Sequence, residues 1–326
     1  MKKSIATILK VLFVGVVFYF LWQKKLISID ALGRAMSQTN HLIPGVLAVI
    51  ITLFLAGLRW QLLLQAQGIQ MKWSRTLQLV FIGQFFNIAL PGAVSGDFVK
   101  AFYAADESKV ERGRAFGSIL FDRIVGLSAL VLVSAGALLI RYRDFVGTPL
   151  FSGIKVFISV AAVCVFVFYT YLFLVKEAHD PVFRLLSYLE AKNAKFGTLK
   201  KIYEGTRHYH HHRIVVLQAL AISVVIHLFV GFGCIQFAYA LGETQLSPLA
   251  LYVVVPLGCL VTAIPVLPGG VGTGHAAFSG LFQLIGSQRG ADVFSFQVLC
   301  QFLMGAIGGL VYLRFKSGKV SVPATE

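Results

Sequence analysis

An acid and a base lie beside a helix break in "FFNIALPGAVSGDFVKAFY", residues 85–103. Asp97 and Lys100 are three residues apart, a spacing that places both side chains on one face of a helix. Pro91 has no backbone N–H and Gly92 accepts a positive φ, so together they end a helix abruptly. Ionisable groups are costly in apolar surroundings, which favours a functional role. Two interpretations stay open: an ion pair between kinked packing helices, or part of a binding site.

The helix that follows such a break could bind an anion. Its first N–H groups carry partial positive charge and have no partner within the helix, so they could seat a phosphate. Gly96 would allow a ligand or a neighbouring helix to approach closely. Gly269, Gly270 and Gly272 would do the same in a second glycine-rich segment, "LPGGVGTG" at 267–274.

Other ionisable residues lie inside apolar runs. Arg59 either extends toward the membrane surface or contributes to the site. Asp122 and Arg123 are adjacent, so they point in different directions and are not each other's partners. Arg123 could bind a phosphate with two hydrogen bonds or pair with Asp97 from another helix. His275 begins a helix, as a structural hydrogen-bonding residue or as a group that exchanges protons.

The elements that must position these groups are membrane helices. The 326 residues are 57% hydrophobic and only 13% charged, against about 45–50% and about 25% in soluble domains. Strand-like alternation is absent from the apolar runs, which favours an all-α membrane bundle over a barrel. The net charge of +15 indicates the positive-inside bias and anionic lipid rather than nucleic acid. No motif in the sequence predicts an enzyme, a cofactor or a metal site.

Hydropathy predicts about six full spans and two hairpins. The segment 176–213 carries eight Lys and Arg, whereas 241–248 carries none. The first is therefore expected in the cytoplasm and the second outside, which puts both termini of a multi-pass cytoplasmic-membrane protein on the cytoplasmic side. The predicted spans are 5–22, 44–66, 115–140, 152–175, 214–240 and 294–315, and the predicted hairpins are 77–104 and 249–286.

The order of elements predicts an inverted repeat. Residues 1–140 contain two spans, a hairpin and a span, and residues 141–326 contain the same series with the basic loop 176–213 inserted. Each half crosses the membrane an odd number of times, so the second half is inverted. "LPGAV" at 90–94 and "LPGGV" at 267–271 mark corresponding breaks. This is the architecture of many secondary transporters, which bind their substrate where the repeats meet.

Three motifs resemble those of the lysylphosphatidylglycerol synthase transmembrane, or flippase-like, family. They are "NIALPGAVSGDFVKAF" at 87–102, "RAFGSILFDRIVGL" at 114–127 and "PVLPGGVGTGHAAF" at 265–278. The resemblance covers nearly the whole chain and implies that its first motif contributes Asn87, Pro91, Gly92, Gly96, Asp97 and Lys100, with Asp122 and Arg123 downstream. Ser95 replaces a usual Gly, Lys100 a common Arg, and His275 a frequent Glu.

The resemblance implies a lipid flippase or transporter that moves a phosphate-containing lipid, aminoacyl-, phospho- or polyprenyl-linked, between leaflets. In two-domain members a soluble aminoacyl transferase follows the membrane part, which leaves room for a separate synthase or transferase as partner here. Two alternatives remain. A membrane-embedded lipid-modifying enzyme could use Asp97, Asp122 and His275 for acid–base chemistry. A non-transporting accessory subunit of a lipid or cell-envelope pathway could use 176–213 as its docking surface.

Overall fold

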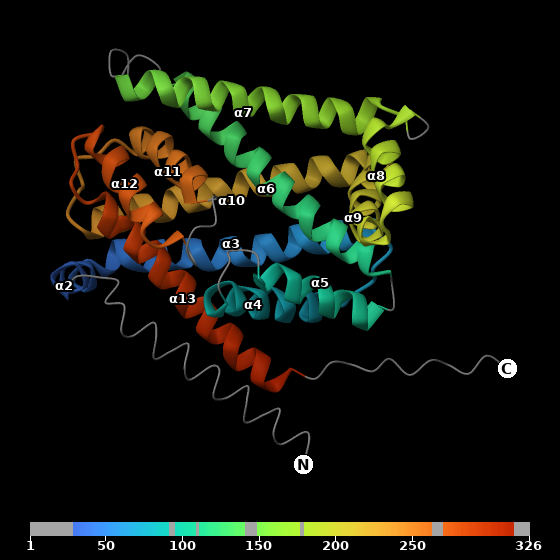
Figure 1. Cartoon of the computed structure of the whole chain (residues 1–326). Coiled ribbons are helices and arrows are strands. Elements are labelled where there is room, and N and C mark those ends of the chain that lie inside the picture. Colours follow the sequence, from blue (N-terminus) through green and yellow to red (C-terminus); the bar gives the residue numbers. More distant parts are fainter. Residues whose placement is uncertain are drawn as a thin grey trace.

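The computed structural model describes residues 29–90, 95–108, 111–140, 149–176, 179–262 and 270–315. All regular structure within these ranges is helical (Figure 1). The predicted all-α membrane fold is therefore confirmed. The predicted first span, 5–22, lies outside the described residues.

Five helices are long and apolar enough to cross a membrane, and they confirm five of the predicted spans. Each begins one to five residues before the predicted run and ends within one residue of it, because hydropathy does not mark a polar first turn. They are α3 (Thr39–Ala66), α6 (Arg112–Ile140), α7 (Pro149–Leu174), α10 (Arg213–Ala240) and α13 (Gly290–Arg314).

Each predicted hairpin consists of two shorter helices. The first is α4 (Trp73–Ala89) and α5 (Ser95–Ser108), and the second is α11 (Pro248–Thr262) and α12 (Thr273–Gln283). The reason α4 ends is local: Leu90 is extended, with φ −109° and ψ 147°, the conformation imposed on a residue before proline.

The helices α3 and α10 form a central pair on which α6 and α13 pack, whereas α7 packs against α6. The first hairpin packs against α13 through α4, and the second packs against α6 through α11. Four hydrophobic clusters form among the described residues, and the two largest include residues of the hairpins. One includes Trp60 and Leu79 and joins α3 to α6. The other includes Phe237 and Phe296 and is formed mainly by α10 to α13.

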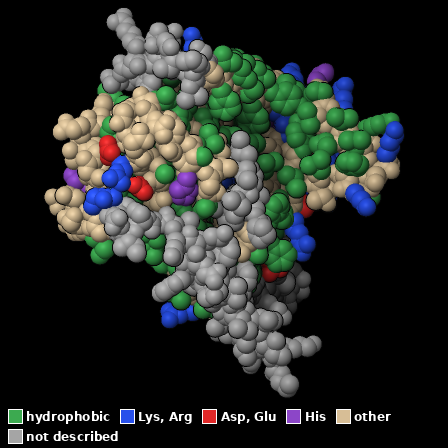
Figure 2. All heavy atoms as spheres, turned by 60° about the vertical axis from the view of Figure 1, so that its left-hand side comes forward, with side chains coloured by type: hydrophobic (Ala, Val, Ile, Leu, Met, Phe, Trp, Pro, Cys, Tyr) green, Lys and Arg blue, Asp and Glu red, His purple; other side chains and the backbone are tan. Residues whose placement is uncertain are grey.

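The outer surface is apolar. Little of α7 is buried, and its exposed side chains include Phe157 and Phe166. Figure 2 shows hydrophobic side chains gathered over the upper and right-hand part of the visible face, with Lys and Arg along its edges. Such a surface suits hydrocarbon on its sides and water or headgroups at its ends.

The segment after α7 forms short helical pieces. They are α8 (Pro181–Lys192), η3 (Ala194–Phe196), α9 (Gly197–Arg207) and η4 (His208–His211), while α2 (Ile29–Ser37) precedes α3. Asp180 caps α8 by accepting the Phe183 N–H. Burial opposes its charge, but hydrogen bonds from Tyr171, Phe183, Tyr203 and Arg207 hold the pKa of Asp180 below its ordinary value. These bonds fasten α8 and α9 to the end of α7.

Candidate functional site

The Asp97 carboxylate forms ion pairs with two basic side chains, those of Lys100 and Arg123, where α5 meets α6. Its Oδ1 lies 2.9 Å from Lys100 Nζ, and its Oδ2 accepts a hydrogen bond of 2.5 Å from Arg123 Nε. The ion pair of Asp97 with Lys100 and the pairing of Arg123 with Asp97, each considered from the sequence, are therefore both present. The Asp97 side chain is 5% exposed, whereas that of Arg123 is 50% exposed. Arg123 is thus the member of the cluster that a ligand can reach.

Lys100 is held inside the first half of the chain. Its Nζ lies 4.9 Å from the centroid of the Trp60 ring, a favourable position for a cation over an aromatic face. Trp60 in turn donates from Nε1 to Ser118 Oγ at 3.3 Å. With Asp97 on one side and Trp60 on the other, Lys100 keeps its charge away from water.

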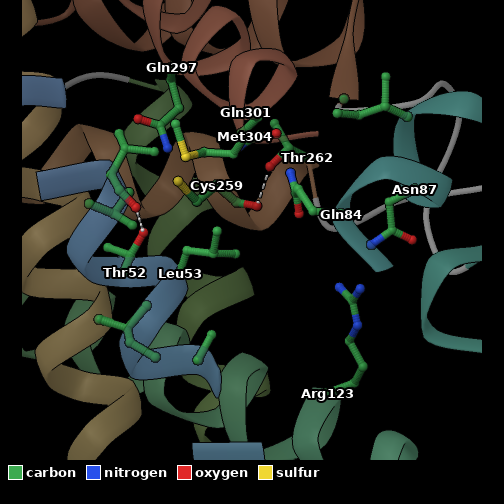
Figure 3. A pocket seen from close by; sticks show the side chains of 16 residues that line it. Thr52, Leu53, Gln84, Asn87, Arg123, Cys259, Thr262, Gln297, Gln301 and Met304 are labelled. Atoms are coloured by element: carbon green, nitrogen blue, oxygen red, sulfur yellow. Dashed lines mark hydrogen bonds between the residues drawn. The ribbon is translucent and has the colours of Figure 1, made fainter. Parts of the chain in front are cut away.

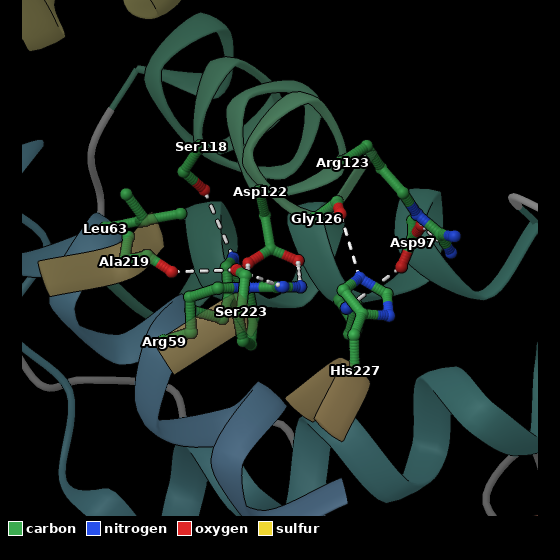
Figure 4. A network of polar contacts seen from close by, with 12 residues as sticks. Arg59, Leu63, Asp97, Ser118, Asp122, Arg123, Gly126, Ala219, Ser223 and His227 are labelled. Atoms are coloured by element: carbon green, nitrogen blue, oxygen red, sulfur yellow. Dashed lines mark hydrogen bonds and ion pairs between the residues drawn. The ribbon is translucent and has the colours of Figure 1, made fainter. Parts of the chain in front are cut away.

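A second ion pair joins Arg59 to Asp122 (Figure 4). Arg59 Nε lies 2.7 Å from Asp122 Oδ1 and Arg59 Nη2 lies 2.9 Å from Oδ2, a bidentate arrangement. Arg59 Nη1 also donates to Ser223 Oγ at 2.8 Å, which links α3, α6 and α10. Arg59 is buried, so the alternative in which it extends to the membrane surface is wrong.

The two clusters contain three cations and two anions. Arg59 and Asp122 neutralise each other, whereas Asp97 faces both Lys100 and Arg123. One positive charge therefore remains in excess. Arg123 carries its charge on a half-exposed guanidinium, so it is available to form charge-assisted hydrogen bonds with an anion.

Arg123 points into a cavity of about 380 Å³ that is lined mainly by residues of α3, α4, α6, α10, α11 and α13 (Figure 3). Arg123 is the only charged residue among the described residues that line it. Its other polar lining groups are amides, hydroxyls and one thiol. The lining consists of Val49, Thr52, Leu53, Ala56, Gln84, Asn87, Ile88, Arg123, Ile226, Val230, Cys259, Thr262, Gly270, Gln297, Gln301 and Met304.

Asn87 connects the arms of the first hairpin. Its Oδ1 accepts the backbone N–H of Gly96 at 2.9 Å, so at least that N–H at the start of α5 is already used. Asp97 lies in the same first turn. Gly96 has to be glycine, because a Cβ there would lie 1.8 Å from the Gly83 carbonyl oxygen. The N-terminus of α5 is thus tied into the hairpin, and Arg123 is the better-placed group for an anion.

His275 organises the start of α12. Its Nδ1 accepts the Gly272 N–H at 3.3 Å, and its Nε2 lies 3.0 Å from Ser295 Oγ. Ser295 already donates to Ala291 O, so the Nε2–H donates and the neutral tautomer satisfies both contacts. Gly272 has φ +89°, a conformation that favours glycine.

The structure separates the predicted site residues into groups. Asn87, Arg123 and Gly270 line the cavity. Asp97 pairs with Arg123 and with Lys100, and so connects Lys100 to the cavity. Gly96 allows the two arms of the adjoining hairpin to pack closely. Arg59 and Asp122 form the second ion pair, while Gly272 and His275 form the α12 cap outside the lining. Pro91, Gly92 and Gly269 lie outside the described residues.

The sequence interpretation missed the uncharged polar lining. Asn87 was the one uncharged polar side chain that it named, whereas the cavity also presents Gln84, Gln297, Gln301, Thr52 and Thr262. A signal was available: Gln297 and Gln301 are four residues apart in an apolar run, so they share one face of a helix.

These features define a multi-pass helical membrane protein with a polar cavity between its membrane helices. Residues 7–310 match the family described as the lysylphosphatidylglycerol synthase TM region. The chain therefore belongs to the transmembrane region of the lysylphosphatidylglycerol synthase family, as its three motifs predicted. Comparison with curated proteins finds no match, and neither does comparison with solved structures.

Proposed function

We propose that this protein is a lipid flippase or lipid transporter, which moves a phosphate-containing lipid between the leaflets of the cytoplasmic membrane. The observation that carries the proposal is Arg123, a half-exposed guanidinium in a cavity between membrane helices. A guanidinium can bind phosphate with two parallel hydrogen bonds. The excess charge of the clusters is +1, which equals the charge that a phosphodiester neutralises.

The helix positions support an inverted repeat of α3 to α6 in α10 to α13. Corresponding helices begin at nearly constant separations of 174 to 178 residues. The paired starts are Thr39 and Arg213, Trp73 and Pro248, Ser95 and Thr273, and Arg112 and Gly290.

The packing supports the same relation. The central helices α3 and α10 correspond to each other and pack together. The α4 helix packs against α13, and its counterpart α11 packs against α6, which is the counterpart of α13. The α5–α6 contact likewise has its equivalent in α12–α13. In this arrangement the cavity lies where the two repeats meet, the usual place of a transporter site.

In the proposed transport mechanism, two re-entrant hairpins enter the membrane from opposite faces. The phosphate binds at Arg123 while the acyl or prenyl chains stay in the bilayer beside the apolar outer surface. Rocking of one repeat against the other exposes the cavity to each leaflet in turn. The proposal includes no covalent step.

Arg123→Gln tests the proposal more cleanly than Asp97→Asn. Replacing Asp97 would leave Lys100 and Arg123 without their shared carboxylate, and an unpaired buried charge can unfold the protein. Replacing Arg123 leaves Asp97 paired with Lys100 at 2.9 Å. The measurement is leaflet exchange of labelled phosphodiester lipids in vesicles that contain the purified protein.

We expect Arg123→Gln to slow exchange by about 10- to 100-fold, the equivalent of one charged hydrogen bond of about 1.5–3 kcal/mol. Lys155→Gln is the matched control, because Lys155 is an exposed cation of α7 outside the cavity lining. Wild-type exchange by folded Arg123→Gln protein, or no exchange by the wild type, would contradict the proposal.

A further inference from the structure

Gln297 lines the cavity and has one buried side-chain atom without a hydrogen-bond partner. Its side-chain Oε1 has no hydrogen-bond partner, and the residue is 7% exposed. It lies on α13 and lines the cavity (Figure 3). A buried amide oxygen without a partner costs about 1–3 kcal/mol. A ligand that offers a donor at this position would recover that free energy.

Two hydroxyl groups present further acceptors. Thr52 Oγ1 donates its hydrogen to Val49 O at 2.7 Å, and Thr262 Oγ1 donates to Cys259 O at 2.8 Å. A hydroxyl has one hydrogen and two lone pairs. Because both hydrogens are used within their own helices, each oxygen can offer lone pairs to a ligand.

Donors lie in the same cavity. Asn87 uses its Oδ1 to accept the Gly96 N–H, so its amide hydrogens remain for another acceptor. Arg123 adds guanidinium N–H groups. A ligand that fills this cavity therefore needs donors and acceptors side by side, and a hydroxyl group supplies both.

The charges disfavour a cationic ligand. An ammonium group could satisfy the acceptors, but it would meet Arg123 and a cluster with an excess charge of +1. No acidic residue is present among the described lining residues. A like charge in this environment would be repelled.

We infer that the cavity binds an uncharged, hydroxyl-bearing headgroup, such as a polyol or a sugar, attached to the phosphodiester that Arg123 binds. The inference rests on the proposed function for the identity of its ligand as a lipid. The volume of about 380 Å³ lies at the small end of the range for small-molecule sites, about 300–1,000 Å³. An aminoacylated, cationic headgroup does not match this lining.

The test compares three lipids for binding to the purified full chain in detergent micelles. Phosphatidylglycerol carries two free hydroxyls, phosphatidylpropanol has the same charge and nearly the same size without them, and lysyl-phosphatidylglycerol is cationic. We expect the apparent Kd of phosphatidylglycerol to be about tenfold lower than that of either other lipid, the equivalent of one lost hydrogen bond. Gln297→Leu should reduce the preference over phosphatidylpropanol to about threefold or less, chiefly by weakening phosphatidylglycerol.

Gln283→Leu is the matched control, because Gln283 is exposed at the end of α12 and outside the cavity lining. Equal affinity for phosphatidylglycerol and phosphatidylpropanol, preference for the lysyl lipid, or an unchanged preference in folded Gln297→Leu protein would overturn the inference. Leaflet exchange of the same lipids separates the two proposals. Selective binding without exchange would contradict the transport proposal and leave the headgroup inference intact. Exchange without headgroup selectivity would contradict the headgroup inference and leave the transport proposal intact.

Discussion

At the scale of residues, the two ion pairs have different roles. Arg59 and Asp122 bond through two parallel contacts of 2.7 and 2.9 Å and carry no net charge together. Removing one partner of such a pair is strongly destabilising, because the other charge is then buried without compensation. Replacing both partners together by apolar residues costs far less. The pair therefore holds α3 to α6 and is not the group that meets the ligand.

This role predicts the outcome of a double-mutant cycle. Arg59→Met and Asp122→Leu should each lower stability by about 3–5 kcal/mol, because each leaves a buried charge unpaired. The double variant should regain most of that loss. The measurement is unfolding of the purified protein in detergent, with lipid exchange as a second readout. A double variant whose loss equals the sum of the single losses would show that the pair is not coupled.

Part of this chemistry could be predicted from local spacing. The shared face of Asp97 and Lys100, and the divergence of Asp122 from Arg123, both follow from helix geometry. The partner of Asp122 could not be predicted, because Arg59 is 63 residues away and the contact depends on how α3 crosses α6. Gln297 was not predicted, because an uncharged amide in an apolar run is a weaker indication of a binding site than a charged side chain.

At the scale of elements, the first hairpin depends on close contact of its two arms. Gly83 on α4 faces Gly96 on α5, and the position of a Cβ on Gly96 would lie 1.8 Å from a backbone oxygen. Backbone cannot yield as a flexible side chain does. The Asn87–Gly96 hydrogen bond and the position of Asp97 both require this contact.

Gly96→Ala should therefore separate the arms and destabilise the protein by several kcal/mol, as overpacking of a core does. Gly136→Ala in α6 is the matched control, because a Cβ there meets nothing within 4 Å. It should stabilise by up to about 1 kcal/mol through helix propensity. Thermal unfolding of both variants checks this, and equal behaviour would show that the contact does not matter.

The elements themselves could be predicted well, and their ends less well. Hydropathy located α10 at 214–240, where the structure has Arg213–Ala240, but it placed the start of α3 at 44 instead of Thr39. The polar first turn of α3 carries no hydropathy signal. The end of α4 was predictable, because proline fixes the conformation of Leu90 before it.

At the scale of the whole molecule, one contact bears on how the hairpins are oriented. Glu111, between α5 and α6, lies 2.7 Å from Lys201 of α9 through its side chain. The open end of the first hairpin is therefore next to the basic segment. Thr244 and Gln288 flank the second hairpin, before α11 and after α12. The inverted repeat requires these two positions to lie on the opposite face of the membrane.

Cysteine labelling checks that requirement. In a variant without Cys164, Cys234, Cys259 and Cys300, single cysteines at Lys195 and Glu111 should react only from the cytoplasmic side. Single cysteines at Thr244 and Gln288 should react only from outside. All four positions are exposed. Labelling of the Glu111 and Gln288 positions from the same side would contradict the inverted arrangement.

The excess positive charge beside the cavity has a consequence for the membrane potential. Under the proposed function, a phosphodiester neutralises the site, so the loaded protein moves no net charge through the electric field. The empty site stays positive, and one elementary charge crossing the whole field changes the free energy by about 2.3 kcal/mol per 100 mV. An inside-negative potential would then draw the empty site inward and drive the lipid from the cytoplasmic to the outer leaflet.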